Sequence, residues 1–333
     1  MNLEQLLSEC IDKKASDLHL STGLSPAMRI DGDLCFIDAP SCQQDKISDM
    51  LHDIMDKNQQ QAFARELETD FGIDIEALNS RFRVNAFMQE RGPAVVFRII
   101  PQTVSSLEAL NAPDTFKKIV AAKQGLILVT GPTGSGKSTT LAAMIDHINH
   151  TQKGHIISIE DPIEFIHQSK QCLINQREVK RDTLSFNNAL KSALREDPDY
   201  IFVGEMRDLE SIRLAITAAE TGHLVLATLH TASAPKTIDR IINVFPAEEQ
   251  HMVRSMLSES LQAVISQVLL KKKGGGRIAA HEILLANTAI RHLIHEGKIA
   301  QMYNTLQTSQ NIGMQTLQQS IDKLIAKGVI NAT

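Results

Sequence analysis

The fold of this chain is decided by one stretch, Gly131-Pro132-Thr133-Gly134-Ser135-Gly136-Lys137-Ser138. It matches the pattern G-x-x-x-x-G-K-[ST] at every fixed position. An apolar run at 126–129 precedes it, and an amphipathic segment follows at 141–148. We therefore expect a strand, a glycine-rich loop and a helix in that order. The alternative is a glycine-rich turn that matches the pattern by chance, and such a turn would not require a strand before it and a helix after it.

The residue types of this loop suit the binding of a nucleotide. Glycines let backbone N–H groups curl around phosphate oxygens at the positive end of the following helix. We expect Lys137 to reach the β- and γ-phosphates, Ser138 to offer its hydroxyl to Mg²⁺, and Thr139 to hydrogen-bond an earlier phosphate. The expected cofactors are therefore ATP and Mg²⁺.

Alternating strands and helices extend from this loop toward the C-terminus. The expected strands are 126–130, 156–160, 200–203, 224–229 and 278–284, with a long helix over 248–270. This alternation is typical of an α/β domain with a parallel sheet. From residue 287 onward the chain is expected to form a small helical bundle.

The first hundred residues follow a different pattern. Short strand-like runs lie at 16–20, 28–30, 70–75, 81–88 and 94–100, and a polar helical stretch lies at 43–65. They predict an antiparallel sheet packed with helices. We accordingly expect a domain at 1–100, a linker at 101–115, a nucleotide domain at 116–285 and a helical subdomain at 286–333.

Composition bounds the function. The net charge is −5 and the pI is about 6.2, so the chain lacks the basic footprint of a nucleic-acid-binding protein. The four cysteines form no C-x-x-C pair, which favours a reduced, cytosolic protein. No signal peptide is expected, and no apolar run approaches the roughly 20 residues of a membrane span.

Carboxylates and histidines follow several of the expected strands. Glu164 and Glu205 come after strand ends, where side chains face the ligand crevice of a parallel sheet. Either could be a solvated charge, but beside a complete phosphate loop both become candidate site residues. His223 and His230 bracket one strand and lie about 23 Å apart at strand rise, too far to share a metal ion. A lone histidine at a strand end is more often structural.

These motifs, in this order, resemble the secretion ATPase superfamily of type II secretion and type IV pili. The resemblance rests on residues 131–138, 159–164, 200–205 and 221–231. It is closer still to the retraction ATPases of type IV pili at 15–21, 81–87, 175–179, 193–199 and 203–208. The resemblance implies a PAS-like α+β domain, a RecA-like P-loop ATPase domain with a C-terminal helical bundle, and a ring-shaped homohexamer.

The resemblance also implies roles for the candidate residues. Glu164 would polarise the attacking water, and Glu205 would join Ser138 in holding Mg²⁺, partly through water. His223 and His230 would sense the nucleotide. Arg83 and Arg98 would be the pair that stabilises charge on a γ-phosphate, in cis or from a neighbouring subunit. Strand arginines are otherwise often only solvated.

The segment 289–296 is similar to the C-terminal signature of these retraction ATPases. Ile290, Leu293 and Ile294 form an apolar stripe at helical spacing. The stripe could simply dock the C-terminal bundle. Alternatively, the opposite face, with Arg291, His292 and His295, could transmit movement to the rest of the machine.

The resemblance thus implies a hexameric retraction motor that acts through an inner-membrane platform protein, with a second retraction ATPase as a further partner. We expect it at the cytoplasmic face of that membrane. Four alternatives stay open. They are an accessory retraction ATPase, a pilus-assembly or type II secretion motor, a nucleic-acid translocase, and a nucleotide-gated scaffold without turnover. Assembly motors normally carry a longer N-terminal region, and the acidic pI weighs against the translocase.

Overall fold

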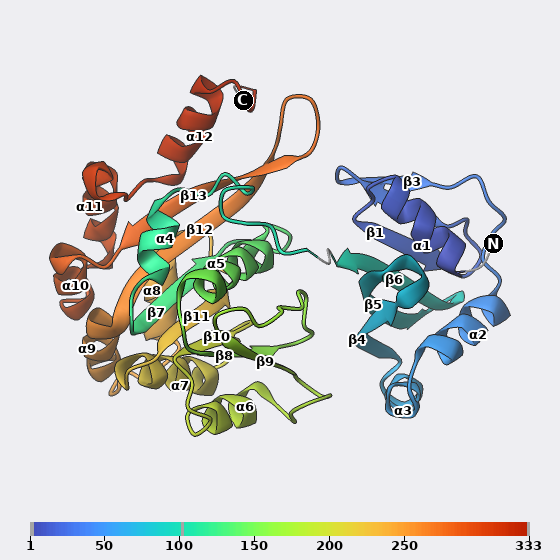
Figure 1. Cartoon of the computed structure of the whole chain (residues 1–333), viewed down its shortest axis with the longest axis horizontal. Helices are drawn as coiled ribbons and strands as arrows, with labels where there is room; N and C mark the ends of the chain where they lie inside the picture. The colour runs from blue at the N-terminus through green and yellow to red at the C-terminus, as the bar shows by residue number, and fades with distance from the viewer. Residues whose placement is uncertain (1–2, 101–102, 332–333) are drawn as a thin grey trace. The chain divides into compact units, whose positions relative to one another are not determined.

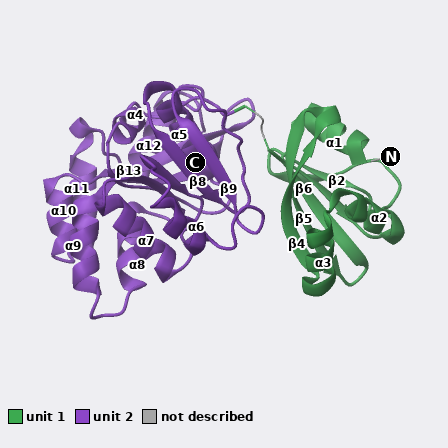
Figure 2. Ribbon diagram, turned by 60° about the horizontal axis from the view of Figure 1, so that its bottom comes forward, with its two compact units in different colours: residues 1–103 green, residues 104–333 purple. Residues whose placement is uncertain are grey.

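The computed structural model describes residues 3–100 and 103–331. The chain divides into two compact units, Met1–Thr103 and Val104–Thr333 (Figure 2). The first residues of the expected linker, Pro101 and Gln102, lie outside the described residues. None of the helices in the described ranges has both the length and the apolar character that a membrane crossing requires.

Unit 1 is built on a six-stranded antiparallel sheet with the order β3-β2-β1-β6-β5-β4. Its elements are α1 (Leu3–Asp12), β1 (Asp17–Ser21), β2 (Ala27–Ile30), β3 (Asp33–Phe36), α2 (Gln44–Ile54), α3 (Lys57–Glu66), β4 (Glu68–Ile75), a 3₁₀ turn (Glu76–Leu78), β5 (Ser80–Gln89) and β6 (Gly92–Ile100). The expected antiparallel sheet with helices is confirmed. The polar stretch at 43–65 is two helices, because Asp56 caps a second helix with its own capping box.

Unit 2 contains a seven-stranded sheet with the order β13-β12-β7-β11-β10-β8-β9. Its strands are β7 (Gly125–Thr130), β8 (His155–Glu160), β9 (Leu173–Glu178), β10 (Tyr200–Val203), β11 (Leu224–Leu229), β12 (Leu261–Lys271) and β13 (Arg277–Leu285). Every neighbouring pair is parallel except β12 with β13. The predicted α/β fold with a parallel sheet is confirmed.

Helices cover both faces of this sheet (Figure 1). They are α4 (Thr115–Val120), α5 (Lys137–Thr151), α6 (Phe186–Ala193), α7 (Leu209–Glu220), α8 (Ala234–Asn243), α9 (Gln250–Ser260), α10 (Thr288–His295), α11 (Met302–Thr308) and α12 (Leu317–Ala326), with 3₁₀ turns at Ile299–Gln301 and Gln310–Ile312. Alternate residues of β7 enter separate cores: Ile127 and Val129 pack with α4 and α5, whereas Leu126 and Leu128 pack with α6 to α10. The central strands are therefore apolar on both sides.

The expectation of one long helix over 248–270 is wrong. Helix α9 ends at Ser260, and the chain continues directly as β12, which lies between β7 and β13. Residues 261–270 are mostly apolar and mostly buried, and their polar members Gln262, Ser266 and Gln267 do not alternate regularly, so no clear period separates a strand from a helix. The edge strand β9 was also not predicted, because it is polar and only partly buried.

Helix α10 carries the C-terminal signature, and its residues make two kinds of structural contact. Ile290, Leu293 and Ile294 are buried against the core, as the stripe predicted. Arg291, however, donates hydrogen bonds from Nη1 to the carbonyls of Ser258 and Glu259 at the end of α9. Arg291 therefore caps a helix C-terminus, and the role of its face in transmitting movement stays a prediction. His292 and His295 are exposed.

Candidate nucleotide site

The glycine-rich loop joins β7 to α5, as the sequence predicted. Gly131 has φ +145°, and a Cβ there would lie 2.3 Å from the carbonyl oxygen of Gln267, so no larger residue fits. Lys137 folds back across the loop and donates to the carbonyls of Gly131 and Pro132 at 2.9 and 3.0 Å. Burial lowers the pKa of the Lys137 ammonium, while the charges of Glu205 and Glu164 raise it. The ammonium is thus coupled electrostatically to both candidate carboxylates.

Gln267 of β12 holds the loop and was missed by the sequence analysis. Its Nε2 donates to the Ser135 carbonyl at 2.7 Å, and its Oε1 accepts from Thr140 Oγ1 at 2.9 Å. The side chain is 1% exposed, so both bonds form in a dry environment. Residue 267 was expected in a helix, so no signal in the sequence connected it with the loop.

The loop fits an anionic ligand. The Ser135 hydroxyl is buried and has no hydrogen-bond partner among the described residues. Gly134 and Gly136 have φ of +75° and +86°, and no atom within 4 Å would crowd a Cβ at Gly134. An unsatisfied donor and an open, glycine-lined turn at a helix N-terminus suit the phosphates of a nucleotide. Ser138, one residue into α5, is partly exposed and can offer its hydroxyl to Mg²⁺.

A cavity of about 240 Å³ continues from the loop along α5. Thr139, Thr140 and Gln267 form the side nearest the phosphate loop. The remaining walls come from Ala109–Ala112 and from the β12–β13 hairpin, including Leu269, Lys272, Arg277 and His281. A partly apolar hollow that begins beside Thr139 suits the base and sugar of a nucleotide.

The carboxyl end of β10 carries a charged cluster around Glu205. His230 Nε2 lies 3.2 Å from Glu205 Oε1, and Arg207 Nε donates to Glu205 Oε2 at 2.9 Å. Arg207 also reaches Asp161, with Nη1 3.8 Å from Oδ2. Because β8, β10, β11 and β7 are parallel, their carboxyl ends meet at this edge of the sheet. The structure thus brings Glu205 and His230 together as predicted residues of one edge.

Glu164 lies on the segment that follows β8, after a cis peptide bond between Asp161 and Pro162. At the end of β8, the Glu160 carboxyl is 7% exposed, and burial raises its pKa to about 7. Ser158 Oγ and Gln176 Nε2 donate to its Oε1 at 2.7 and 3.1 Å. A buried carboxyl therefore stands beside the candidate water-polarising residue, which the sequence analysis did not anticipate.

His223 and His230 flank β11 and lie at opposite ends of that strand. Leu229 pairs with Thr130 of β7, so His230 follows the strand at the phosphate loop. Leu224 pairs with Gly125, so His223 precedes the strand at the far edge, where its Nδ1 lies 3.0 Å from the Ala218 carbonyl. This placement agrees with the separation expected from the sequence, and the sensing role of His223 and His230 stays a prediction.

Arg83 and Arg98 are cross-strand neighbours in unit 1. Arg83 Nη2 lies 2.6 Å from Asp70 Oδ2, and Arg98 Nε lies 2.8 Å from Asp17 Oδ1. The Arg98 side chain is 53% exposed, so its ion pair is open to water. Their role toward a phosphate stays a prediction, since the phosphate loop belongs to unit 2.

Comparison with known proteins places the chain in a family. The family described as "Type II/IV secretion system protein" matches residues 1–274. The chain belongs to this family.

Individual proteins of known name are also similar to the chain. The chain is 59% identical over 331 residues to the "Type IV pilus retractation ATPase PilT" of Pseudomonas aeruginosa, covering 99% of this chain and 96% of that protein. It is 59% identical over 307 residues to the "Twitching motility protein" of Neisseria gonorrhoeae, covering 92% and 82%. Among solved structures, "the Pilus Retraction Motor PilT and Bound ADP" matches with a TM-score of 0.89 at 46% identity, covering 99% and 95%. The P. aeruginosa "Type IV pilus ATPase PilU" is 40% identical.

Proposed function

We propose that this protein is an ATP-hydrolysing motor that drives retraction of type IV pili, and with it twitching motility. The observation that carries the proposal is the near-full-length match, at 59% identity, to a type IV pilus retraction ATPase. The phosphate loop with Lys137 folded across it supports the nucleotide chemistry. The lower identity to PilU, 40%, favours the principal retraction motor over the accessory one.

The residues of the site divide the work of hydrolysis. Lys137 leaves its carbonyl partners and binds the β- and γ-phosphates, and the backbone of residues 131–136 surrounds the phosphate oxygens. Ser138 and Glu205 would hold Mg²⁺, partly through water, and the ion would supply positive charge to the phosphate oxygens. Glu164 orients and polarises the attacking water. His230 senses the bound phosphates, and its contact of 3.2 Å with Glu205 links this sensing to the Glu205 carboxylate.

Arg83 and Arg98 supply positive charge to the transition state. Each pairs with a carboxylate in unit 1, Arg83 with Asp70 and Arg98 with Asp17. The protein works as a homohexamer, in which such an arginine can act on a neighbouring subunit. Its partners are the inner-membrane platform protein of the pilus and a second retraction ATPase, at the cytoplasmic side where ATP is available.

A phosphate-release assay on the purified protein tests the enzymatic part of this proposal. The protein should hydrolyse ATP with Mg²⁺ present, and chelation of Mg²⁺ should stop turnover. Added DNA or RNA should leave the rate unchanged, which would exclude the translocase. ATP binding without phosphate release would contradict the proposal and favour a nucleotide-gated scaffold.

A further inference from the structure

The segment that carries Glu164 is held by side chains from two neighbouring strands. Glu178 Oε2 of β9 accepts from the Ile163 N–H at 3.1 Å. The backbone N–H of Glu164 itself donates to the carboxyl of Glu160, at the end of β8. Two successive peptide groups of the segment are therefore fixed by buried carboxyls.

Gln176 of β9 completes this arrangement with three hydrogen bonds. Its Oε1 accepts from the His167 N–H at 2.7 Å, and its Nε2 donates to the Phe165 carbonyl at 2.8 Å. The same Nε2 donates to Glu160 Oε1 at 3.1 Å. The carboxamide thus pairs with the segment as a backbone peptide group of an adjacent strand would, and it ties the segment to Glu160.

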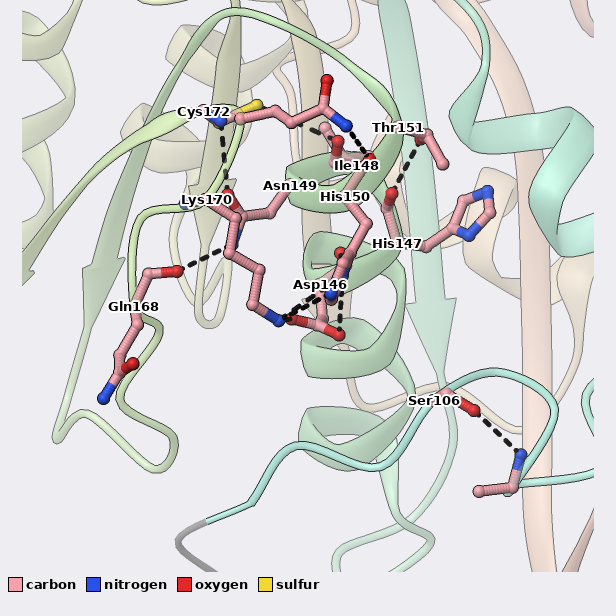
Figure 3. Close-up of polar contacts among 12 residues, drawn as sticks. Ser106, Asp146, His147, Ile148, Asn149, His150, Thr151, Gln168, Lys170 and Cys172 are labelled. Carbon is pink, nitrogen blue, oxygen red and sulfur yellow. Dashed lines mark hydrogen bonds and ion pairs between the residues drawn. The ribbon is translucent and has the colours of Figure 1, made fainter.

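The far end of the same loop is anchored independently. Asn149, a fully buried residue of α5, donates from Nδ2 to the Gln168 carbonyl at 2.8 Å and accepts on Oδ1 from the Lys170 N–H at 2.9 Å (Figure 3). Asn149 Oδ1 also accepts from the Cys172 N–H at 3.3 Å. The helix that begins with Lys137 therefore fixes residues 168–172, independently of the contacts that Gln176 makes to residues 165 and 167.

We propose that Gln176 is a positioning residue for hydrolysis, which acts through Glu164 by fixing the segment 163–167. The proposal rests on the function of Glu164 proposed above. Carboxylate oxygens that orient a water must be placed to within a fraction of an ångström, and a 1 Å displacement can cost about 10²-fold in rate. No other residue type reproduces the carboxamide pattern. Glu lacks the N–H donors, and Asn is shorter by one methylene.

The test replaces Gln176 by Met, which keeps the length of the side chain and removes its polar atoms. Asn175→Ala is the matched control, because Asn175 neighbours Gln176 on β9 and contacts only His155 Nε2 at 2.9 Å among the bonds described. For each variant we would measure kcat by phosphate release and the Kd of a fluorescent ADP analogue. Hydrogen exchange of peptides spanning 163–168 would report the order of the segment.

In Gln176→Met, kcat should fall roughly 10- to 100-fold while the Kd of the ADP analogue changes less than about twofold. Exchange at 163–168 should accelerate, because the His167 N–H loses its acceptor. In a double-mutant cycle with Glu164→Gln, the two losses should not add, since Gln176 acts only through Glu164. If Gln176→Met does not fold, Gln176→Glu takes its place. It keeps the acceptor for the His167 N–H and loses both donors, so kcat and the double-mutant cycle decide in place of exchange.

Three results would overturn the inference: a kcat equal to that of Asn175→Ala, unchanged exchange at 163–168, or an additive loss in the cycle. Absence of hydrolysis by the wild-type protein would instead contradict the proposed function. The exchange measurement would still decide whether Gln176 fixes the segment.

Discussion

Among single residues, Lys137 and Glu164 have separable tasks. The buried Lys137 ammonium lies across the phosphate loop and donates to the carbonyls of Gly131 and Pro132. Glu164 lies on a different segment and is assigned to water. Lys137→Ala should weaken ATP binding and abolish hydrolysis, whereas Glu164→Gln should bind ATP normally and lose about 10²- to 10⁴-fold in kcat. Equilibrium binding and phosphate release measure the two effects. Equal loss of affinity in both variants would refute this division.

The buried carboxyl of Glu160 should make stability depend on pH. Burial raises its pKa from 4.5 to about 7, so the folded protein binds this proton more tightly than the unfolded chain does. The contribution is fully present below the unfolded pKa and is lost as the pH rises through the folded pKa. Glu160→Gln has no proton to lose, so its free energy of unfolding should fall less than that of the wild type between about pH 5 and pH 8. Denaturant titrations at several pH values measure this difference; identical pH slopes would contradict it.

Some residues of the site could be predicted from the sequence and others could not. The loop at 131–138 was predictable because its pattern is local and each position has its own chemical reason. The separation of His223 and His230 was also predictable, because it follows from the rise of the strand between them, and the register of β11 on β7 agrees with it. Glu160 and Gln176 were not singled out, because their roles arise from hydrogen bonds between β8 and β9 that no local pattern encodes.

At the scale of elements, most strands of unit 2 were predicted, and β9 and β12 were not. Strands β7, β8, β10, β11 and β13 were expected within a residue or two of their bounds. Strand β12 was taken for a helix, because a strand buried on both faces has no alternation. Gln267 was therefore not predicted as a site residue, because a residue expected on a helix could not be connected with the phosphate loop.

Strand β12 should prove necessary for nucleotide binding through Gln267. Gln267→Met removes the bonds to Ser135 and Thr140, and should lower the free energy of unfolding by about 1–3 kcal/mol and weaken ADP binding by about tenfold. Gln262→Met is the matched control, because Gln262 lies at the other end of β12 and donates to the Gln124 carbonyl. Unchanged ADP affinity in a folded Gln267→Met protein would show that β12 does not shape the loop.

At the scale of the whole molecule, the arginines of unit 1 and the loop of unit 2 raise the question of assembly. If the charge on a γ-phosphate is stabilised by a neighbouring subunit, mixing Arg83→Ala and Lys137→Ala proteins should restore part of the activity. Some junctions would then combine an intact arginine with an intact loop, and such arginines are worth on the order of 10³-fold or more in kcat. Phosphate release from mixed and reassembled protein measures the effect. Activity that never exceeds that of either variant alone would place Arg83 in cis or outside the reaction.

The central claim is that ATP hydrolysis powers retraction. It is tested most directly in cells of the source organism from which the gene has been deleted, and in the same cells after the wild-type or the Glu164→Gln allele has been added back. The measurement counts surface pili and scores twitching in each strain. Loss of the gene, or the Glu164→Gln allele alone, should give surplus pili without twitching, and the wild-type allele should restore both to normal. Cells without surface pili would contradict the account, because they would identify an assembly motor.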